Sequence, residues 1–328
     1  MNRFWKDVGI AVTMGWIVPA VLLTAVISLA GKRTEIPALT EPIVMLETAA
    51  EPETEGGLLV SVLDDGEEVE EIPLHDYLTG VVLAEMPVSF ENEALKAQAV
   101  VARTYTIRAA NGAAKHQNAD VCTNSECCQG YMDVEHYLKE GGIQANVQRI
   151  SNLIAETAGQ VLTYDGKLIE ATYFSCSGGM TEDAVAVWGT DVPYLRSVPS
   201  PGEEHAAHYT DSTTLKADEL ESKLDVELSS DPEDWFSDVD YTDSGSVATI
   251  EIGGEIFTGS QLRKLLGLRS TAFTVAVQGH QITFHTRGYG HRVGMSQYGA
   301  DAMAASGSTY DEILAHYYQG AELTDDFD

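Results

Sequence analysis

An acidic Met-Pro turn leads directly into a long Ala-rich run, and this combination constrains the chain more than any other feature. Pro87 disfavours the helical conformation at the residue before it, so we expect Glu85 to lie in a turn or at a strand end. Ser89 is a suitable helix N-cap, and residues 90–110 contain neither Pro nor Gly. The sequence therefore predicts a helix over 90–110 whose start holds a carboxylate.

Two cations share one side of this predicted helix. Lys96 and Arg103 are seven residues apart, which places them on the same face at helical spacing. Cations beside an acid suit an active site for an anionic or polyhydroxyl substrate. An ordinary buried helix with solvated Lys and Arg gives the same pattern, so the spacing alone leaves both interpretations open.

Three segments, in this order along the chain, resemble stage II sporulation protein D, a family of bacterial cell-wall glycan-cleaving enzymes. They are residues 84–105, the Tyr-Phe-Ser-Cys-Ser-Gly-Gly run at 173–179 and the Gly-rich residues 288–300. The resemblance covers about residues 58–320, and the region 207–270 carries no recognised motif. It implies that Glu85 is the catalytic acid. It also implies a set of glycan-binding residues: Lys96, Gln98, Arg103, Tyr105, Tyr173, Ser175, Ser177, His291, Ser296 and Gln297.

The reaction that the resemblance implies is that of a lytic transglycosylase acting on denuded glycan strands. Glu85 would protonate the glycosidic oxygen leaving N-acetylmuramic acid, and its conjugate base would help the sugar's own 6-hydroxyl close a 1,6-anhydro ring. One acid suffices because the nucleophile is intramolecular, although the acid needs a raised pKa to stay protonated near neutrality. Hydrolysis normally uses two carboxylates, and Asp183 near Trp188 keeps that alternative open.

Other classes of protein fit the same residues. A non-catalytic wall-binding module is one, because the domain also resembles amidase enhancers, and an inactive sporulation scaffold is another. A zinc hydrolase built on His116, Cys122 and Cys128 is a third, but the chain contains no His-Glu-x-x-His motif.

The cysteines allow either a disulfide or a metal site. In an exported domain Cys122 could bridge to Cys127 or Cys128, and the even spacing of His116, Cys122 and Cys128 equally suits zinc. The resemblance favours zinc, because some family members bind it with one His and two Cys at this spacing. We expect a structural rather than catalytic ion, with Cys127 as a spare ligand. We interpret Cys176 as a buried small side chain rather than a nucleophile.

The N-terminal region predicts a membrane anchor. Residues 8–30 carry no charge and would span roughly 35 Å as a helix, enough to cross a bilayer. We expect residues 1–33 to be an uncleaved anchor, residues 34–57 a disordered linker and residues 58–328 the glycan-cleaving domain.

The remaining pattern predicts an α+β fold. The Ala-rich helix should pack on short antiparallel strands, with a second β-rich lobe from about Val161 and a cleft between them. Asp165 and Gly166 predict a hairpin turn within 161–169, and residues 300–318 predict a helical hairpin.

Charge and resemblance set the expected partners. A net charge of −32 excludes a polynucleotide partner, because phosphate backbones require a basic surface. The resemblance implies an extracytoplasmic domain on the mother-cell engulfing membrane during sporulation. Its partners would be peptidoglycan strands and stage II sporulation proteins P, an amidase-endopeptidase, and M.

Overall fold

The computed structural model describes residues 57–64 and 68–325. The expected anchor lies outside the described residues, as does nearly all of the expected linker. Among the residues that are described, no helix has both the length and the apolar character needed to cross a membrane.

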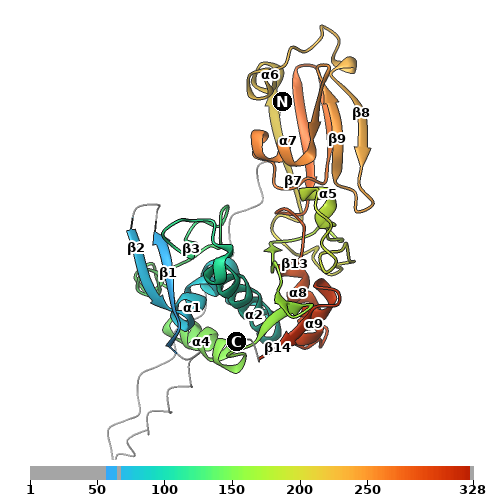
Figure 1. Ribbon diagram of the computed structural model, residues 1–328. Coiled ribbons are helices and arrows are strands. Elements are labelled where there is room, and N and C mark those ends of the chain that lie inside the picture. The colour runs from blue at the N-terminus through green and yellow to red at the C-terminus, as the bar shows by residue number, and fades with distance from the viewer. Residues whose placement is uncertain (1–56, 65–67, 326–328) are drawn as a thin grey trace, which may run out of the picture. The chain divides into compact units, whose positions relative to one another are not determined.

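A buried helix forms the centre of the first hydrophobic core. Helix α2 (Asn92–Arg108) packs against four other helices, and its alanines let them approach closely, since Ala94, Ala97 and Ala99 are fully buried. Figure 1 shows this arrangement. The four partners are α1 (Leu74–Glu85), α4 (Gln144–Glu156), α8 (Gln297–Ala305) and α9 (Tyr310–Tyr317).

Three small sheets border this core. The first has the order β2-β1-β3, the second β14-β4-β5, and the third pairs β13 with β6 in parallel. Asp165 and Gly166 both have positive φ, which confirms the predicted hairpin turn. The strands are β1 (Leu59–Asp64), β2 (Glu68–Pro73), β3 (Val121–Cys122), β4 (Val161–Tyr164), β5 (Lys167–Leu168), β6 (Tyr173–Phe174), β13 (Met295–Ser296) and β14 (Glu322–Thr324). The short helical segments are Ala109–Ala113, α3 (Val134–Lys139) and α5 (Ala184–Trp188).

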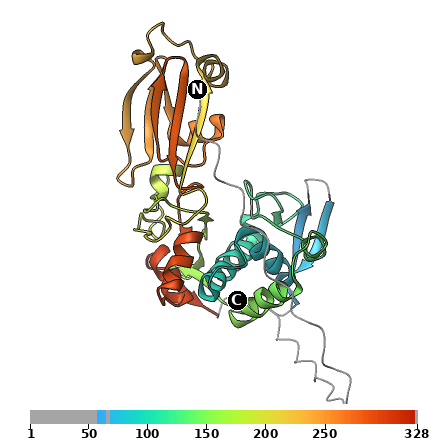
Figure 2. The same ribbon diagram turned by 180° about the vertical axis from the view of Figure 1, so that it is seen from behind.

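A second hydrophobic core lies within residues 210–287, which we call the inserted lobe. It contains two three-stranded antiparallel sheets, in the orders β10-β9-β8 and β11-β12-β7 (Figure 2). Its strands are β7 (Thr210–Lys216), β8 (Phe236–Tyr241), β9 (Val247–Ile252), β10 (Glu255–Thr258), β11 (Phe273–Gln278) and β12 (Gln281–Arg287). Its helices are α6 (Ala217–Leu224), the 3-10 turn Pro232–Asp234 and α7 (Gly259–Leu266).

The structure confirms a mixed α+β fold and the C-terminal helical hairpin, and it corrects two boundaries. The β-rich lobe begins at Thr210 rather than near Val161, because β4 contacts α2 and belongs to the first core. Helix α2 begins at Asn92 with Glu91, not Ser89, as its N-cap.

Glu85 also differs from the expectation, because it is the last residue of helix α1 rather than part of a turn or strand end. Pro87 acts only on Met86, whose φ of −123° and ψ of 140° are extended. Helix α1 therefore ends at Glu85, and the backbone becomes extended at Met86. This fixes the backbone that carries the carboxylate.

Candidate active site

The Glu85 carboxylate lies among three polar groups from different parts of the chain. The Gly130 N–H donates to its Oε1 at 2.5 Å, and the Gln297 side-chain amide donates to its Oε2 at 3.4 Å. The Tyr173 hydroxyl is also within hydrogen-bonding reach. Glu85 makes no ion pair among the residues that the structure describes. The site thus joins the end of α1, the cysteine loop and both later motifs.

Burial raises the pKa of Glu85 above its ordinary value, because the surroundings disfavour the charged form. The hydrogen bonds from Gly130, Gln297 and Tyr173 oppose that rise, since each stabilises the carboxylate. An upward shift of the pKa suits a group that must hold a proton near neutral pH and release it to a leaving oxygen.

A second layer of polar side chains holds Tyr173. Its hydroxyl donates to Gln129 Oε1 at 3.3 Å, and Gln129 in turn donates to the hydroxyls of Tyr77 at 3.4 Å and Thr106 at 3.0 Å. Gln129 is 1% exposed and adjoins Gly130, so one short segment of backbone supports both Glu85 and Tyr173.

Four potential metal ligands gather just before this segment. The ligand atoms of His116, Cys122, Cys127 and Cys128 all lie within 4.8 Å of one another, and all three cysteines are free thiols. His116 Nε2 is 3.6 Å from Cys127 Sγ and 3.4 Å from Cys128 Sγ. Tetrahedral zinc places S and N ligand atoms about 3.5–3.8 Å apart. The donor set therefore fits zinc, and it includes Cys127 beyond the three predicted ligands.

One buried carboxylate that sequence reasoning missed organises the two later motifs. Glu203 is fully buried, and its Oε2 accepts from the N–H groups of Ser177, Gly178 and Gly179 at 2.9–3.1 Å and from Ser177 Oγ at 2.7 Å. No sequence signal distinguished Glu203 from the exposed Glu204 beside it.

His291 lies near the rings of Phe174 and Trp188, at centroid distances of 5.6 and 5.7 Å. Its Nδ1 accepts from the Val293 N–H at 3.2 Å. Burial and the nearby cations Arg263 and Lys115 lower the pKa of His291 to about 4. It is therefore a neutral imidazole at physiological pH.

Lys96 and Arg103 share a face of α2, as predicted, but this face contacts the end of α4. Arg103 is fully buried and donates to the carbonyl oxygens of Ile154 at 3.2 Å and Gln160 at 3.3 Å, so it supports packing instead of contacting a glycan. Lys96 forms ion pairs with Glu93 at 3.0 Å and Glu156 at 2.7 Å.

The other two residues of α2 that were predicted to bind glycan, Gln98 and Tyr105, also contact other parts of the protein. Gln98 is fully buried, and its side-chain amide has no hydrogen-bond partner among residues 57–64 and 68–325. Tyr105 lies beside Cys128, with the Lys115 ammonium 5.6 Å from its ring centroid. Direct glycan contact by Gln98 is excluded by its burial in this structure.

Among the serines predicted to bind glycan, two are buried. Ser177 and Ser296 are both fully buried and hydrogen-bonded to Glu203, which corrects the expectation that they border a cleft. Ser175 is half-buried, and its carbonyl oxygen accepts from the Tyr298 N–H at 3.0 Å. Of the predicted set, Tyr173 and Gln297 are the two that meet Glu85.

Arg292 has a φ of 67° and is fully buried. Its guanidinium donates to the Ser177 carbonyl at 2.8 Å and, in the inserted lobe, to the Ser244 carbonyl at 3.0 Å and Ser246 Oγ at 2.5 Å. It therefore fastens the inserted lobe to the Gly-rich motif and adds no charge to an open surface. Cys176 is likewise fully buried, and burial raises the pKa of its thiol to about 12, as expected for a non-nucleophilic side chain.

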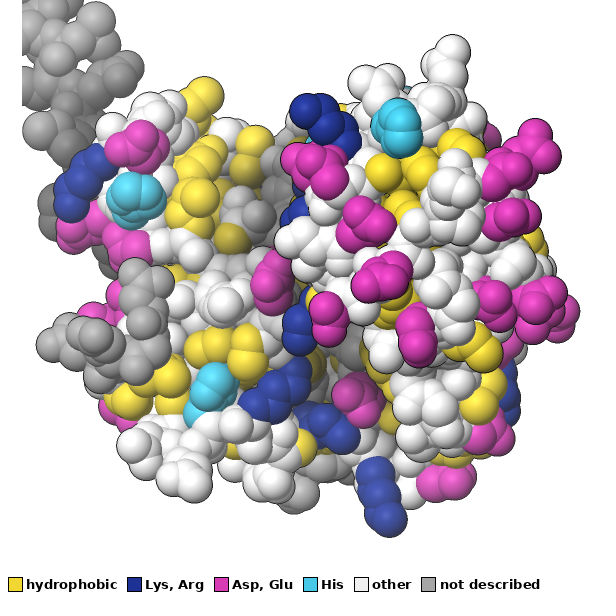
Figure 3. Space-filling view, turned by 90° about the horizontal axis from the view of Figure 1, so that it is seen from above, with side chains coloured by type: hydrophobic (Ala, Val, Ile, Leu, Met, Phe, Trp, Pro, Cys, Tyr) yellow, Lys and Arg dark blue, Asp and Glu magenta, His cyan; other side chains and the backbone are white. Residues whose placement is uncertain are grey.

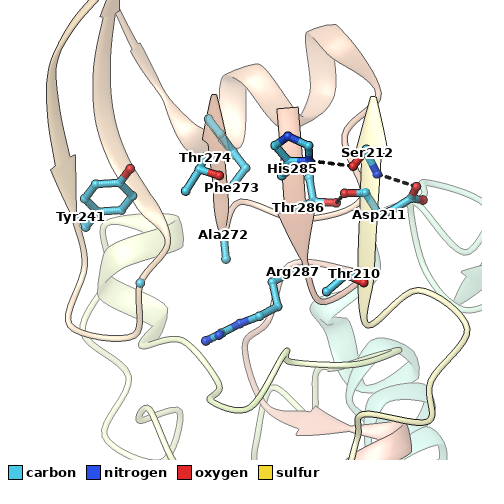
Figure 4. A pocket seen from close by; sticks show the side chains of 11 residues that line it. Thr210, Asp211, Ser212, Tyr241, Ala272, Phe273, Thr274, His285, Thr286 and Arg287 are labelled. Carbon is cyan, nitrogen blue, oxygen red and sulfur yellow. Dashed lines mark hydrogen bonds between the residues drawn. The ribbon is translucent and has the colours of Figure 1, made fainter. Parts of the chain in front are cut away.

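Two surface features lie outside this network. A pocket of about 560 Å³ in the inserted lobe is lined by residues that include Asp211, His285, Arg287 and Tyr241. Figure 4 shows the hydrogen bond between Ser212 and His285, which also line it. Figure 3 shows Lys and Arg side chains along a hollow, with acidic side chains around it.

Comparison with known proteins places the chain in a family. Residues 64–164 match the family described as "Stage II sporulation protein". The chain is 41% identical to stage II sporulation protein D of Bacillus amyloliquefaciens over 78% of this chain and 76% of that protein. Identity to the protein of the same name from Bacillus subtilis (strain 168) is 40%, with the same coverage. An amidase enhancer of Bacillus subtilis (strain 168) is 31% identical over 75% of this chain, which spans 40% of that relative. The chain therefore belongs to the stage II sporulation protein D family.

Proposed function

We propose that this protein is a peptidoglycan lytic transglycosylase in which Glu85 is the catalytic acid and then the base. The observation that carries the proposal is the setting of Glu85: a carboxyl with a raised pKa, no ion pair among the described residues and three polar groups from separate motifs around it. A carboxyl in this setting can protonate a glycosidic oxygen and take a proton back.

The chain's own residues divide the steps between them. Protonated Glu85 gives its proton to the oxygen that leaves N-acetylmuramic acid. The resulting carboxylate is stabilised by the Gly130 N–H and the Gln297 amide, and it accepts the proton of the 6-hydroxyl as that oxygen attacks the anomeric carbon. The product is a 1,6-anhydro end, and no water is consumed.

Two other carboxylates that could activate water for hydrolysis are already engaged. Asp183 accepts from the Ser197 N–H at 3.2 Å and lies 3.9 Å from Arg196. Glu203 is fully buried and accepts hydrogen bonds on both oxygens. This engagement supports the intramolecular reaction over a two-carboxylate hydrolysis.

The substrate we propose is a denuded glycan strand bound in a cleft beside Glu85. The cations Arg263 and Lys115, which lie near His291, would attract the lactyl carboxylates of muramic acid, which matters in a protein with a net charge of −32. Tyr173, Gln297 and the Trp188–His291 pair are the groups we assign to its walls.

We propose further that the His116 cluster holds a structural zinc ion. Three thiolates and one imidazole would fill a tetrahedral shell and leave no open position, which is typical of a structural site. Such an ion would fix the loop that ends in Gln129 and Gly130. We also propose an N-terminal membrane anchor, an extracytoplasmic site of action during engulfment, and stage II sporulation proteins P and M as partners.

The second candidate function is a non-catalytic wall-binding module that enhances an amidase, which the 31% identical relative favours. Incubating denuded glycan strands with wild type and Glu85→Gln separates the two. We expect both proteins to bind glycan, and Glu85→Gln to cleave at least about a hundredfold more slowly. Binding without products by folded wild type would favour the wall-binding module.

A further inference from the structure

Glu203 lies at the meeting point of three chain segments that are far apart in sequence. Its Oε2 accepts four hydrogen bonds from residues 177–179, as described above. Its Oε1 accepts from Ser200 Oγ at 2.8 Å and from Ser296 Oγ. Ser200 Oγ is also 2.6 Å from the Tyr317 hydroxyl of α9. A single side chain thus binds six donors and has no contact with solvent.

The Ser296 hydroxyl connects this carboxylate to helix α8. Ser296 is the N-cap of α8, and its Oγ accepts from the Gly299 N–H at 3.3 Å. The next residue is Gln297, whose amide reaches Glu85. The orientation of Gln297 therefore depends on how the first turn of α8 is held.

We propose that Glu203 is a positioning residue that holds Gln297 against Glu85 through the hydroxyl of Ser296. The inference rests on the proposed role of Glu85, and Glu203 itself touches neither the glycan nor Glu85. Its chemistry suits the task, because a carboxylate only accepts hydrogen bonds and can satisfy six converging donors.

An amide in place of this carboxylate would break one half of the arrangement. Gln at 203 can keep one oxygen toward the three N–H groups, but it then presents an N–H to the hydroxyls of Ser200 and Ser296. Those hydroxyls can then only accept from the amide, so their protons lose the carboxylate acceptor, and the hold on the first turn of α8 weakens. Loss of the Gln297 hydrogen bond would remove one of the groups that stabilise ionised Glu85.

The test is an NMR titration of Glu85 in the full-length protein, with Glu carboxyl carbons labelled and the Glu85 signal assigned by its loss in Glu85→Gln. The titratable groups that face Glu85 are the hydroxyls of Tyr173 and Tyr77, which stay protonated because burial raises both pKa values. We expect Glu203→Gln to raise the pKa of Glu85 by about half a pH unit or more. The exposed neighbour provides the matched control, Glu204→Gln, which should leave it unchanged.

A double substitution shows whether the effect passes through Gln297. In a Gln297→Leu background, Glu203→Gln should change the pKa of Glu85 no further. Ser296→Ala removes the connecting hydroxyl, which is also the N-cap of α8, and should reproduce the rise, which keeps the test informative if Glu203→Gln does not fold. An unchanged Glu85 pKa in folded Glu203→Gln or Ser296→Ala would overturn the proposal, as would a rise that persists without Gln297.

The titration needs no catalytic turnover, so it separates this inference from the proposed function. If wild type fails to cleave glycan but Glu203→Gln still raises the pKa of Glu85 through Gln297, only the proposed transglycosylase activity is refuted. Cleavage that depends on Glu85 but is indifferent to Glu203→Gln, with no change in the Glu85 pKa, would refute the positioning role alone.

Discussion

Glu85 illustrates how the setting of a proposed catalytic acid costs stability at the scale of one residue. Its carboxyl ends a helix, where it accepts hydrogen bonds from Gly130 and Gln297 but loses much of its hydration. Since its folded pKa is raised above the unfolded value, the folded state binds the Glu85 proton more tightly, and ionisation at neutral pH opposes folding. The same burial favours the protonated form that the proposed reaction requires.

Glu85→Gln should therefore stabilise the protein at neutral pH. The stability that the Glu85 carboxyl contributes to the wild type is fully present below the unfolded pKa of Glu. It is lost as pH rises through the raised folded pKa. The advantage of Glu85→Gln in unfolding free energy should grow across that window and vanish in acid. Urea unfolding of both proteins at several pH values measures it, and a constant difference would contradict the assignment.

Gly130 leaves no room for a side chain beside Glu85. A Cβ at this position would lie 2.9 Å from Glu85 Oε1, closer than real Cβ contacts allow. We expect Gly130→Ala to displace the carboxylate and reduce cleavage about tenfold to a hundredfold, with little loss of stability. Product formation and thermal unfolding are the paired measurements, and unimpaired cleavage would show that Gly130 does not fix the acid.

At the scale of elements, the cysteine loop is the support of the site. It runs from the ligand cluster through Gln129 to Gly130, so whatever holds the cluster also holds the donor to Glu85. The even spacing of three ligands was visible in the sequence. Cys127 was predicted only as a spare ligand, because adjacent cysteines give no indication of which thiol turns inward, and the structure places it in the cluster.

Cys128→Ser should loosen this loop, and Cys176→Ser is the control because Cys176 lies outside the cluster. We expect Cys128→Ser to lower bound zinc, speed amide hydrogen exchange over residues 120–131 and reduce cleavage. Metal analysis and exchange mass spectrometry check these outcomes. Equal zinc content and equal exchange in the two variants would argue against a metal-held loop.

Helix α2 shows why some of the site could be predicted and some could not. Its existence followed from composition and the absence of Pro and Gly, both local properties. The roles of Lys96 and Arg103 did not follow, because their partners Glu156 and Ile154 belong to α4, which is far from α2 in the sequence. Local pattern predicts elements, whereas burial of a polar side chain depends on what the rest of the chain brings to it.

At the scale of the whole molecule, the described chain has two hydrophobic cores connected by buried polar contacts. Glu182 accepts from Thr242 of the inserted lobe at 2.7 Å, and Arg292 donates to two groups of that lobe. The fold class was predictable from alternating helical and strand patterns. The limits of the inserted lobe were not, because its strands and those of the first core share the same short, turn-bounded pattern.

Arg292→Met should weaken the connection between the two cores. The substitution leaves the carbonyl oxygens of Ser177, Met180 and Ser244 without their donor, each costing about 1–3 kcal/mol when buried. We expect the free energy of unfolding to fall by about 3 kcal/mol or more. Chemical denaturation measures it, and Arg287→Met, at an exposed arginine, is the control that should change little.

Mass spectrometry of the ends produced from denuded glycan strands in heavy-oxygen water tests the proposed reaction. We expect 1,6-anhydro ends, lighter than reducing ends by one water and free of heavy oxygen, from wild type and not from Glu85→Gln. Reducing ends that carry heavy oxygen would contradict it, because they would require an activated water and a second carboxylate that neither Asp183 nor Glu203 supplies here.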